Sequence, residues 1–478
     1  MEKQIWIAVT FITFLLLFAA VGIYSAKQKQ NTTTDYLLAS RKVNPWLTGL
    51  SAIATRHNGG LFIAATGAAY TIGCSFIWIP VAIAIGNHIA WWLIFKKLRL
   101  VSQQTNSDTV SSFLGQENLG KNNQGRAITI ISALIIIVFL GTFASAQLVA
   151  ASKGLSAIFG WNYQVGVVIG AVIVVIYCFS GGIRASIWTD SVQIVLMIVS
   201  LWVLCIAGLI ACGGFGELWI KLNAIDPNLT NWIPRNLPWG FFPYFLGWVV
   251  AGFGVVGHPH ILVRGMAIDS ADNIGLARNI QIFCSLMNSV AGLGIGLTAR
   301  VLLPDLITSK SVELTLPNLS MELLPAVLVG LMLAGLFAAT ISTADSQIIS
   351  CSAALSQDLF SGTAHSYRKA KIATLAVTAL VLAIALMANN SVLFLVIFSW
   401  SVLACGLGPL LVLRVWQKPV SVPVAITMMI TGIVVSIVWN LGLNLSSAIY
   451  EVFPGMLAGF IVYVLANFMT KQNKEQSK

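Results

Sequence analysis

Long, continuous apolar runs dominate the chain and predict an all-α polytopic membrane protein. Most runs are about 20 residues long or longer, the length that a helix needs to cross the hydrocarbon core of a bilayer. The run from Ile5 to Tyr24 exceeds the apolar region of a signal peptide, so we count it as a span. The pattern disfavours a transmembrane β-barrel, because the strands of a barrel alternate apolar and polar residues, whereas the apolar runs here are continuous. We predict about 13 transmembrane helices, at residues 5–25, 45–71, 76–95, 127–151, 161–180, 187–211, 241–262, 279–303, 322–349, 371–388, 391–414, 421–441 and 446–469.

Two of the predicted spans are interrupted by glycine, proline and polar residues. Residues 54–60 (ATRHNGG) interrupt the second span, and residues 252–260 (GFGVVGHPH) interrupt the seventh. Glycine and proline are poor helix formers, and non-helical backbone at membrane depth is tolerated where it lines a cavity or is buried in protein. Both residues are also common in ordinary membrane helices, but the polar residues at both breaks favour a binding site.

The two breaks also divide the chain. Each opens a set of five spans, and transporters built from inverted repeats bind substrate and ions at such interrupted helices. The pattern therefore predicts a single transmembrane transporter domain over residues 1–478, in a five-plus-five inverted-repeat arrangement. We assign a leading helix, a first repeat, a second repeat and two trailing helices to residues 5–25, 45–211, 241–414 and 421–469.

The composition agrees with a membrane protein and excludes several other classes. Hydrophobic residues make up 57% of the chain and charged residues 9%, whereas soluble domains carry about 25% charged residues. A soluble enzyme, a nucleic-acid-binding protein and a disordered protein are therefore excluded, and we expect no enzymatic activity. The seven cysteines have no metal-ligand spacing and are expected to be free and buried.

The net charge of +11 reports on topology. With the C-terminus on the cytoplasmic side, twenty of the lysines and arginines lie inside and six outside, which satisfies the positive-inside rule. We therefore predict an integral, multi-pass protein of the cell (inner) membrane, with the N-terminus outside and the C-terminus cytoplasmic. Its expected partners are the lipid bilayer, a small-molecule solute and an ion, with no nucleic acid.

Ionisable residues within the spans are candidates for function, because a charge in the membrane is costly. Asp190 lies at the start of the sixth span, where it either binds a cation or faces water at a helix N-terminus. Arg56 lies in the first break. Its guanidinium either pairs with a carboxylate such as Asp345, binds a substrate carboxylate, or points into a water-filled vestibule.

The ninth span carries a cluster of hydroxyl side chains. Ser346 follows Ser342 by four residues and Thr343 by three, so it neighbours both on one helix face. Hydroxyl and carbonyl oxygens suit a small, hard cation. Serine and threonine in membranes often bond to their own backbone or across helices instead, but the cluster together with two broken helices favours ion coupling.

At these residues the chain resembles the sodium/solute symporter family, and within it the sodium/proline symporter branch. Three stretches carry the resemblance: residues 181–193 (GGIRASIWTDSVQ), residues 258–261 (HPHI) followed by Arg264, and residues 342–347 (STADSQ). The resemblance covers almost the whole chain. It implies a leucine-transporter-like fold and alternating access driven by a sodium gradient.

The resemblance also implies binding residues, with Na+ as a coupling ion and not a prosthetic group. The main sodium site would use carbonyl and hydroxyl oxygens of Ala54, His57, Ala339, Ser342 and Thr343. A second sodium site, which some members of the family have, would use Asp190 and Ser346. The substrate would lie beside the two breaks, near Arg56, Asn58, Gly59, Gly60, Ala251, Val255, His258 and Pro259.

The sequence departs from the proline branch at two places. Arg56 stands where that branch has an acidic residue, and Gly60, Ala251 and Val255 stand where it has aromatic side chains, which predicts a differently shaped pocket. The leading hypothesis is a sodium-coupled secondary active symporter that imports a small organic solute, an amino acid or a related zwitterion or anion. Two alternatives stay open: a sodium-independent exchanger or facilitator of the same fold, with Arg56 replacing the ion, and a solute-sensing membrane receptor.

Overall fold

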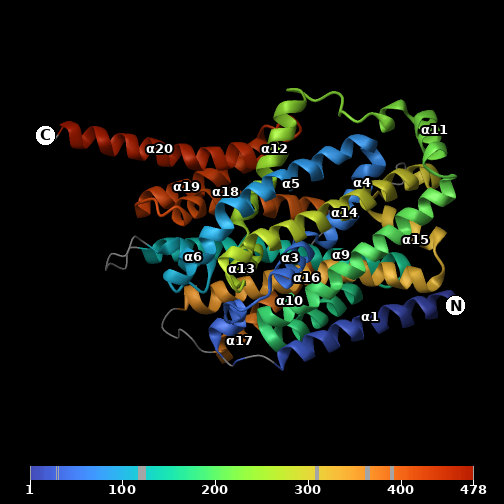
Figure 1. Cartoon of the computed structure of the whole chain (residues 1–478), viewed down its shortest axis with the longest axis horizontal. Coiled ribbons are helices and arrows are strands. Elements are labelled where there is room, and N and C mark those ends of the chain that lie inside the picture. Colours follow the sequence, from blue (N-terminus) through green and yellow to red (C-terminus); the bar gives the residue numbers. More distant parts are fainter. Residues whose placement is uncertain are drawn as a thin grey trace.

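The computed structural model describes residues 2–27, 30, 32–116, 125–306, 312–360, 367–387 and 392–476. Among these residues, long helices lie side by side (Figure 1), and one isolated bridge joins Val43 to Ile268. The helices of the first half are α1 (Glu2–Ala26), α2 (Thr33–Leu38), α3 (Pro45–Arg56), α4 (Gly59–Ile72), α5 (Trp78–Ala90), α6 (Lys96–Gln104), α7 (Val110–Gly115), α8 (Arg126–Ile135), α9 (Gly141–Phe159) and α10 (Tyr163–Cys212). Those of the second half are α11 (Phe215–Ile225), α12 (Phe241–Phe253), α13 (Pro259–Ala267), α14 (Ile274–Leu302), α15 (Thr315–Leu323), α16 (Ala326–Ala353), α17 (Tyr367–Met387), α18 (Val392–Val415), α19 (Val422–Ile437) and α20 (Val452–Gln476).

The predicted all-helical membrane fold is confirmed. Ten helices of the described residues are long and apolar enough to cross a membrane, or up to eleven if the bent pair α12 and α13 counts as one span. One of the ten, Ile63–Gln104, has 42 residues and combines most of α4 with α5 and α6. It contains a left-handed turn at Gly73 (φ 70°). A straight helix of that length would extend about 63 Å, about twice the thickness of a bilayer core. The exact count of thirteen spans and the division into repeats stay predictions.

Both breaks predicted from the sequence are present. α3 ends at Arg56 and α4 begins at Gly59. In the second break, a short 3₁₀ turn over Gly254–Gly257 follows α12, and α13 starts at Pro259 with a bend of 64°. Proline fits the first position of a helix, because that position needs no backbone N–H, and it cannot continue the helix before it.

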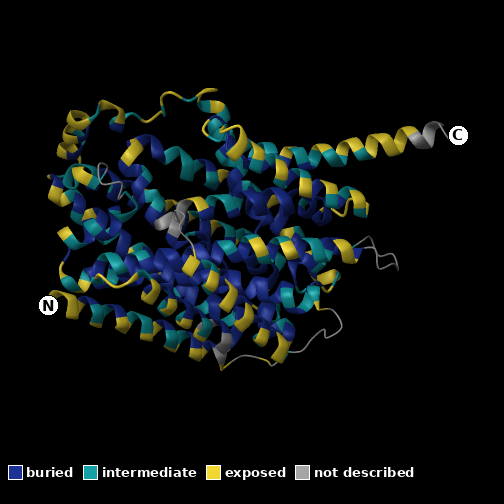
Figure 2. Ribbon diagram, turned by 180° about the vertical axis from the view of Figure 1, so that it is seen from behind, coloured by how far each residue is buried: buried dark blue, intermediate teal, exposed yellow. Residues whose placement is uncertain are grey.

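α16 and α18 form the most buried part of the molecule among the described spans. In the most apolar 18-residue stretch of α16 and of α18, 78% of the residues are buried. In the corresponding stretches of α1 and α20, 22% of the residues are buried. The two outer helices therefore carry many of the exposed residues, and buried residues concentrate in the middle of the molecule (Figure 2). α16 packs against α9, α10 and α1, and α14 packs against α3 and α4. The seven cysteines are free and buried, as predicted.

The 50-residue α10 consists of two helices that meet at Gly182. The backbone angles of Gly182 (φ 58°, ψ −145°) lie close to a region that is essentially restricted to glycine. A Cβ at this position would lie 2.5 Å from the carbonyl oxygen of Tyr36. The Tyr36 hydroxyl in turn donates to the carbonyl of Cys178 over 3.1 Å. This junction directs the second half of α10, which carries Asp190, into the centre of the molecule.

We expect Gly182→Ala to lower the melting temperature of the purified protein in detergent. Alanine would be strained by about 1–3 kcal/mol in this backbone conformation and would also collide with Tyr36. Gly216→Ala is the matched control, because a Cβ there would meet no atom within 4 Å. Equal melting temperatures for the two variants would contradict this account of the junction.

Candidate functional site

The end of α3 is the first component of the site. The helix stops because His57 leaves the helical region (φ −81°, ψ 69°). α4 then begins at Gly59, whose backbone N–H donates to the Gln147 side chain over 3.1 Å. Gly59 packs so closely on α16 that a Cβ would lie 2.0 Å from the Thr340 methyl group. A helix that ends here leaves the carbonyl groups of its last turn without partners in the helix itself.

Hydroxyl groups of α16 satisfy these carbonyls. The Ser342 hydroxyl donates to the carbonyl of Ala54 over 3.1 Å, and the Thr343 hydroxyl donates to the carbonyl of Thr55 over 3.0 Å. Both hydroxyls also reach the Ala339 carbonyl, over 3.4 and 3.0 Å. Four of the five predicted sodium ligands therefore lie together, and the Thr55 carbonyl joins them. The fifth, His57, is the residue that ends α3.

These oxygen groups fit a sodium ion chemically. Backbone carbonyls and hydroxyls are neutral, hard oxygen ligands, and all five residues that meet here are buried. Each hydroxyl donates a hydrogen bond to a carbonyl. If the hydroxyls rotated, their oxygens and the carbonyl oxygens could all face one ion. Their role as the sodium site stays a proposal.

Asp190 lies beside this cluster in a fully buried ion pair. One carboxylate oxygen is 3.1 Å from the guanidinium of Arg264 and accepts from the hydroxyl of Ser51 over 2.6 Å and from that of Thr55 over 3.3 Å. Its other oxygen, Oδ1, is buried and has no hydrogen-bond partner. Asp190 is 0% exposed, so the alternative of a carboxylate that faces water at a helix N-terminus is wrong.

Ser346 and Asp345 complete this buried group. The Arg264 guanidinium donates to the Ser346 hydroxyl, which also lies 2.9 Å from the carboxylate of Asp345. The Ser186 hydroxyl donates to the same carboxylate over 3.0 Å. The two residues predicted for a second sodium site, Asp190 and Ser346, thus lie together, with Arg264 as a shared partner. The sequence pattern did not indicate that partner.

Arg56 faces the other way, toward α14. Its guanidinium donates to the hydroxyl of Ser285, and among the described residues no carboxylate lies within 4.0 Å of it. The predicted pairing of Arg56 with Asp345 is therefore wrong, because the hydroxyls of Ser186 and Ser346 bind that aspartate. His57 Nε2 lies 3.1 Å from the same Ser285 hydroxyl, and Asn288 Nδ2 lies 3.4 Å from His57 Nδ1.

Arg56 and His57 line a cavity of about 310 Å³. It lies between the first break, α4, α5 and α14. Ligand sites are typically clefts of about 300–1,000 Å³ with a few convergent polar groups. The polar groups of α14 that line it are Ser285, Asn288 and Ser289. The sequence analysis missed them, although their i, i+3, i+4 spacing in an apolar span marks a polar face.

The other predicted substrate residues lie around the two breaks. Asn58 is buried between α3 and α4, and Gly60 belongs to α4. Ala251 is buried in α12, where its carbonyl accepts from the Trp400 indole over 3.2 Å, and Val255 is fully buried in the 3₁₀ turn. The ring of His258 stacks on Trp400 with centroids 3.8 Å apart. Their contact with a substrate stays a prediction.

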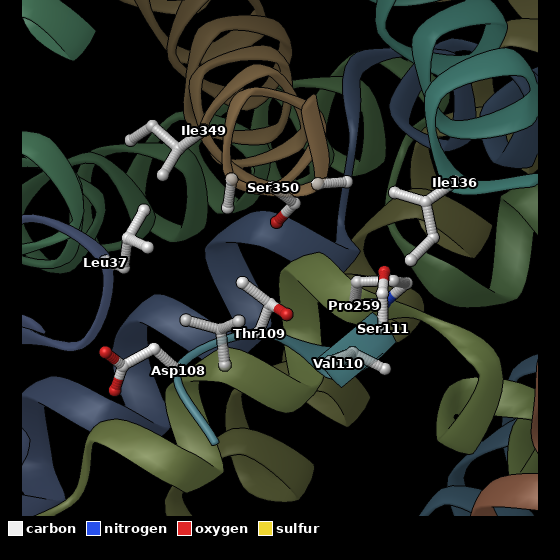
Figure 3. A pocket seen from close by; sticks show the side chains of 12 residues that line it. Leu37, Asp108, Thr109, Val110, Ser111, Ile136, Pro259, Ile349 and Ser350 are labelled. Carbon is white, nitrogen blue, oxygen red and sulfur yellow. The ribbon is translucent and has the colours of Figure 1, made fainter. Parts of the chain in front are cut away.

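Pro259 borders a second, much smaller hollow (Figure 3). Residues of α16, α13 and the segment before α7 surround it, among them Ser350, Asp108 and Thr109. Its volume of about 20 Å³ is close to the space that one water molecule needs.

Two helices broken inside the membrane, with carbonyls, hydroxyls and charges around the breaks, define a secondary transporter. A model of the sodium:solute symporter family matches residues 36–432. The chain therefore belongs to the sodium:solute symporter family.

Similar proteins agree with this family. The chain is 29% identical to the high-affinity proline transporter PutP of Bacillus subtilis, over 94% of this chain and 95% of that protein. It is also 29% identical to the sodium/proline symporter of Escherichia coli, over 97% of this chain and 93% of that protein.

Solved structures share the fold. A Na+-coupled sialic acid symporter, in a substrate-bound outward-open state, superposes with a TM-score of 0.78 at 17% identity, over 96% of this chain and 98% of that chain. The nucleobase-cation-symport-1 family transporter Mhp1, in a closed conformation, superposes with a TM-score of 0.53 at 15% identity, over 90% and 94% of the two chains. The leucine-transporter-like fold is thereby confirmed.

We expect Arg264→Gln to destabilise the protein strongly, because it leaves Asp190 buried without a counter-charge, which costs about 3–5 kcal/mol. The double variant Asp190→Asn/Arg264→Gln should be more stable than Arg264→Gln alone, since both charges are then removed. The melting temperatures of the wild type, Asp190→Asn, Arg264→Gln and the double variant are compared in sodium-free buffer. The difference between the effect of the double variant and the sum of the two single effects measures the coupling of the two residues. Arg278→Gln is the control, because this half-buried arginine bonds to the neighbouring Asn279. Strictly additive effects of the two substitutions would contradict the ion pair.

Proposed function

We propose that the protein is a sodium-coupled symporter that imports a small organic solute by alternating access. The solute occupies the cavity beside Arg56, and sodium binds among the carbonyls of Ala54, Thr55 and Ala339 and the hydroxyls of Ser342 and Thr343. The contact between the end of α3 and α16 carries this proposal. It places the predicted ion ligands from two distant segments within hydrogen-bond distance of one another.

A sodium ion at this position would join two helices that alternating access has to separate. With the ion bound, the end of α3 is held on α16, and the cavity beside Arg56 is ready for solute. Each entering charge gains about 2 kcal/mol per 100 mV of membrane potential, so the ion can drive uphill import. We place the N-terminus outside and the C-terminus in the cytoplasm, in accordance with the charge distribution.

We further propose that Asp190 and Ser346 contribute to a second sodium site. The unpartnered, buried Oδ1 atom of Asp190 supports this, because an acceptor without a partner in such a place is costly. The Arg264 guanidinium pairs with Asp190 and bonds to the hydroxyls of Ser186 and Ser346, which in turn bind the Asp345 carboxylate. With both acids ionised, the group carries a net negative charge that one further cation would neutralise.

The geometry does not favour a sodium-independent exchanger in which Arg56 replaces the ion. The Arg56 side chain bonds to Ser285 on α14, away from the hydroxyls of α16. Uptake of labelled solutes into proteoliposomes, with an inward sodium gradient, an inward proton gradient or none, tests the proposal. Accumulation with sodium alone supports it. Equal uptake in all three conditions identifies a facilitator, and binding without uptake identifies a receptor.

The variant Ser342→Ala/Thr343→Ala should raise the sodium concentration for half-maximal uptake at least tenfold, because it removes two of the five proposed ligands. Ser352→Ala is the matched control, since Ser352 is also buried on α16 and its hydroxyl bonds to the carbonyl of Ile348. Unchanged sodium dependence in a well-expressed double variant would rule out this site.

Asp190→Asn should reduce the number of sodium ions transported per solute, if the second site is real. The ratio is measured from the reversal potential of solute flux in proteoliposomes. The asparagine keeps an acceptor for the hydroxyls of Ser51 and Thr55 but leaves Arg264 without its ion-pair partner, so we expect a lower melting temperature and measure the ratio below it. A folded variant with the wild-type ratio would refute the second site.

A further inference from the structure

The guanidinium of Arg56 is a buried cation that lacks a counter-charge among the described residues. The residue is 5% exposed, and its guanidinium donates to the neutral hydroxyl of Ser285. Its Nε atom is buried and has no hydrogen-bond partner. A guanidinium keeps its charge inside a protein, and an uncompensated charge at membrane depth is expensive. The arrangement is therefore incomplete without an anion.

The buried acids near the break cannot supply that anion in this conformation. Asp190 pairs with Arg264, and Asp345 accepts from the hydroxyls of Ser186 and Ser346. Thr55 and Arg56 are consecutive, but the Thr55 hydroxyl bonds toward Asp190 on α10, whereas Arg56 bonds toward α14. The negative group and the unpaired cation thus lie on different sides of α3.

The groups around Arg56 suit a carboxylate. The Arg56 guanidinium presents a planar set of donors that matches carboxylate geometry. The Ser285 hydroxyl and the Asn288 amide lie in the same wall of the cavity, both within hydrogen-bond distance of His57. A carboxylate seated here would gain charge-assisted hydrogen bonds in a water-poor environment, where they are strong.

The rest of the cavity is apolar. Its wall includes Ala64, Ala68, Ile79, Ile83 and Trp248. Among the described residues of the lining there is no aspartate or glutamate that could bind the ammonium group of an amino acid. One end of the cavity therefore recognises an anionic group, and the remainder of its 310 Å³ accepts an apolar body.

We propose that the solute is an organic monocarboxylate with an apolar body, and that Arg56 binds its carboxylate. This inference rests on the proposed function, because it assigns the solute of the same cavity. It narrows that solute from amino acids, zwitterions and anions to carboxylates that need no ammonium group.

Calorimetric titration of the purified protein in sodium buffer tests the inference. The probes are butanoate, hexanoate and 3-phenylpropanoate, the three corresponding amides, and phenylalanine as the α-amino counterpart of 3-phenylpropanoate. We expect at least one carboxylate to bind at least tenfold more tightly than its amide, and phenylalanine to bind no more tightly than 3-phenylpropanoate. Absence of binding by every carboxylate, or tenfold tighter binding of phenylalanine, would overturn the inference.

Variants of the arginine then locate the carboxylate. Arg56→Gln should remove the preference for the acid over the amide, and Arg56→Lys should keep part of it. Arg278→Gln, at a residue outside the cavity lining, should keep all of it. A preference that survives in Arg56→Gln would show that another group binds the carboxylate.

The effect of sodium on the melting temperature, measured without solute, tests the ion site independently of the carboxylate. If sodium stabilises the wild type but not Ser342→Ala/Thr343→Ala, the ion site stands even where the carboxylate proposal fails.

Discussion

The end of α3 inside the membrane is the constraint on which the rest of the site depends. A helix that stops there exposes carbonyl groups that lipid cannot satisfy, so another element has to supply partners. α16 does so with the hydroxyls of Ser342 and Thr343, and it approaches closely enough only because residue 59 is a glycine. The same carbonyls are then available to a cation when the two hydroxyls rotate and turn their oxygens toward it.

Three consecutive residues connect the ion and the solute. The carbonyls of Ala54 and Thr55 face α16, whereas the side chain of Arg56 faces the cavity and α14. An ion that fixes the last turn of α3 therefore also fixes the position of the guanidinium. Sodium binding and solute binding can therefore be coupled without a long pathway through the protein. It is enough that each ligand orders the same helix end.

The sequence allowed the apolar spans and both breaks to be predicted, because length, hydropathy, glycine and proline act locally. It also allowed Asp190, Arg56 and the hydroxyls of α16 to be selected as candidates, since polar groups are costly in a membrane. It did not allow their partners to be predicted. Arg264 lies 74 residues from Asp190, and Ser285 lies 229 residues from Arg56, so packing of distant helices decides both contacts. The pairing of Arg56 with Asp345 failed for the same reason.

The central claim is that sodium at the end of α3 and a solute carboxylate at Arg56 bind cooperatively. The most direct measurement is the dissociation constant of the tightest-binding carboxylate, determined by calorimetry with saturating sodium and with choline in its place. The account predicts at least tenfold tighter binding in sodium, and the loss of that difference in Ser342→Ala/Thr343→Ala. The same carboxylate affinity in sodium and in choline, in wild-type protein, would contradict it.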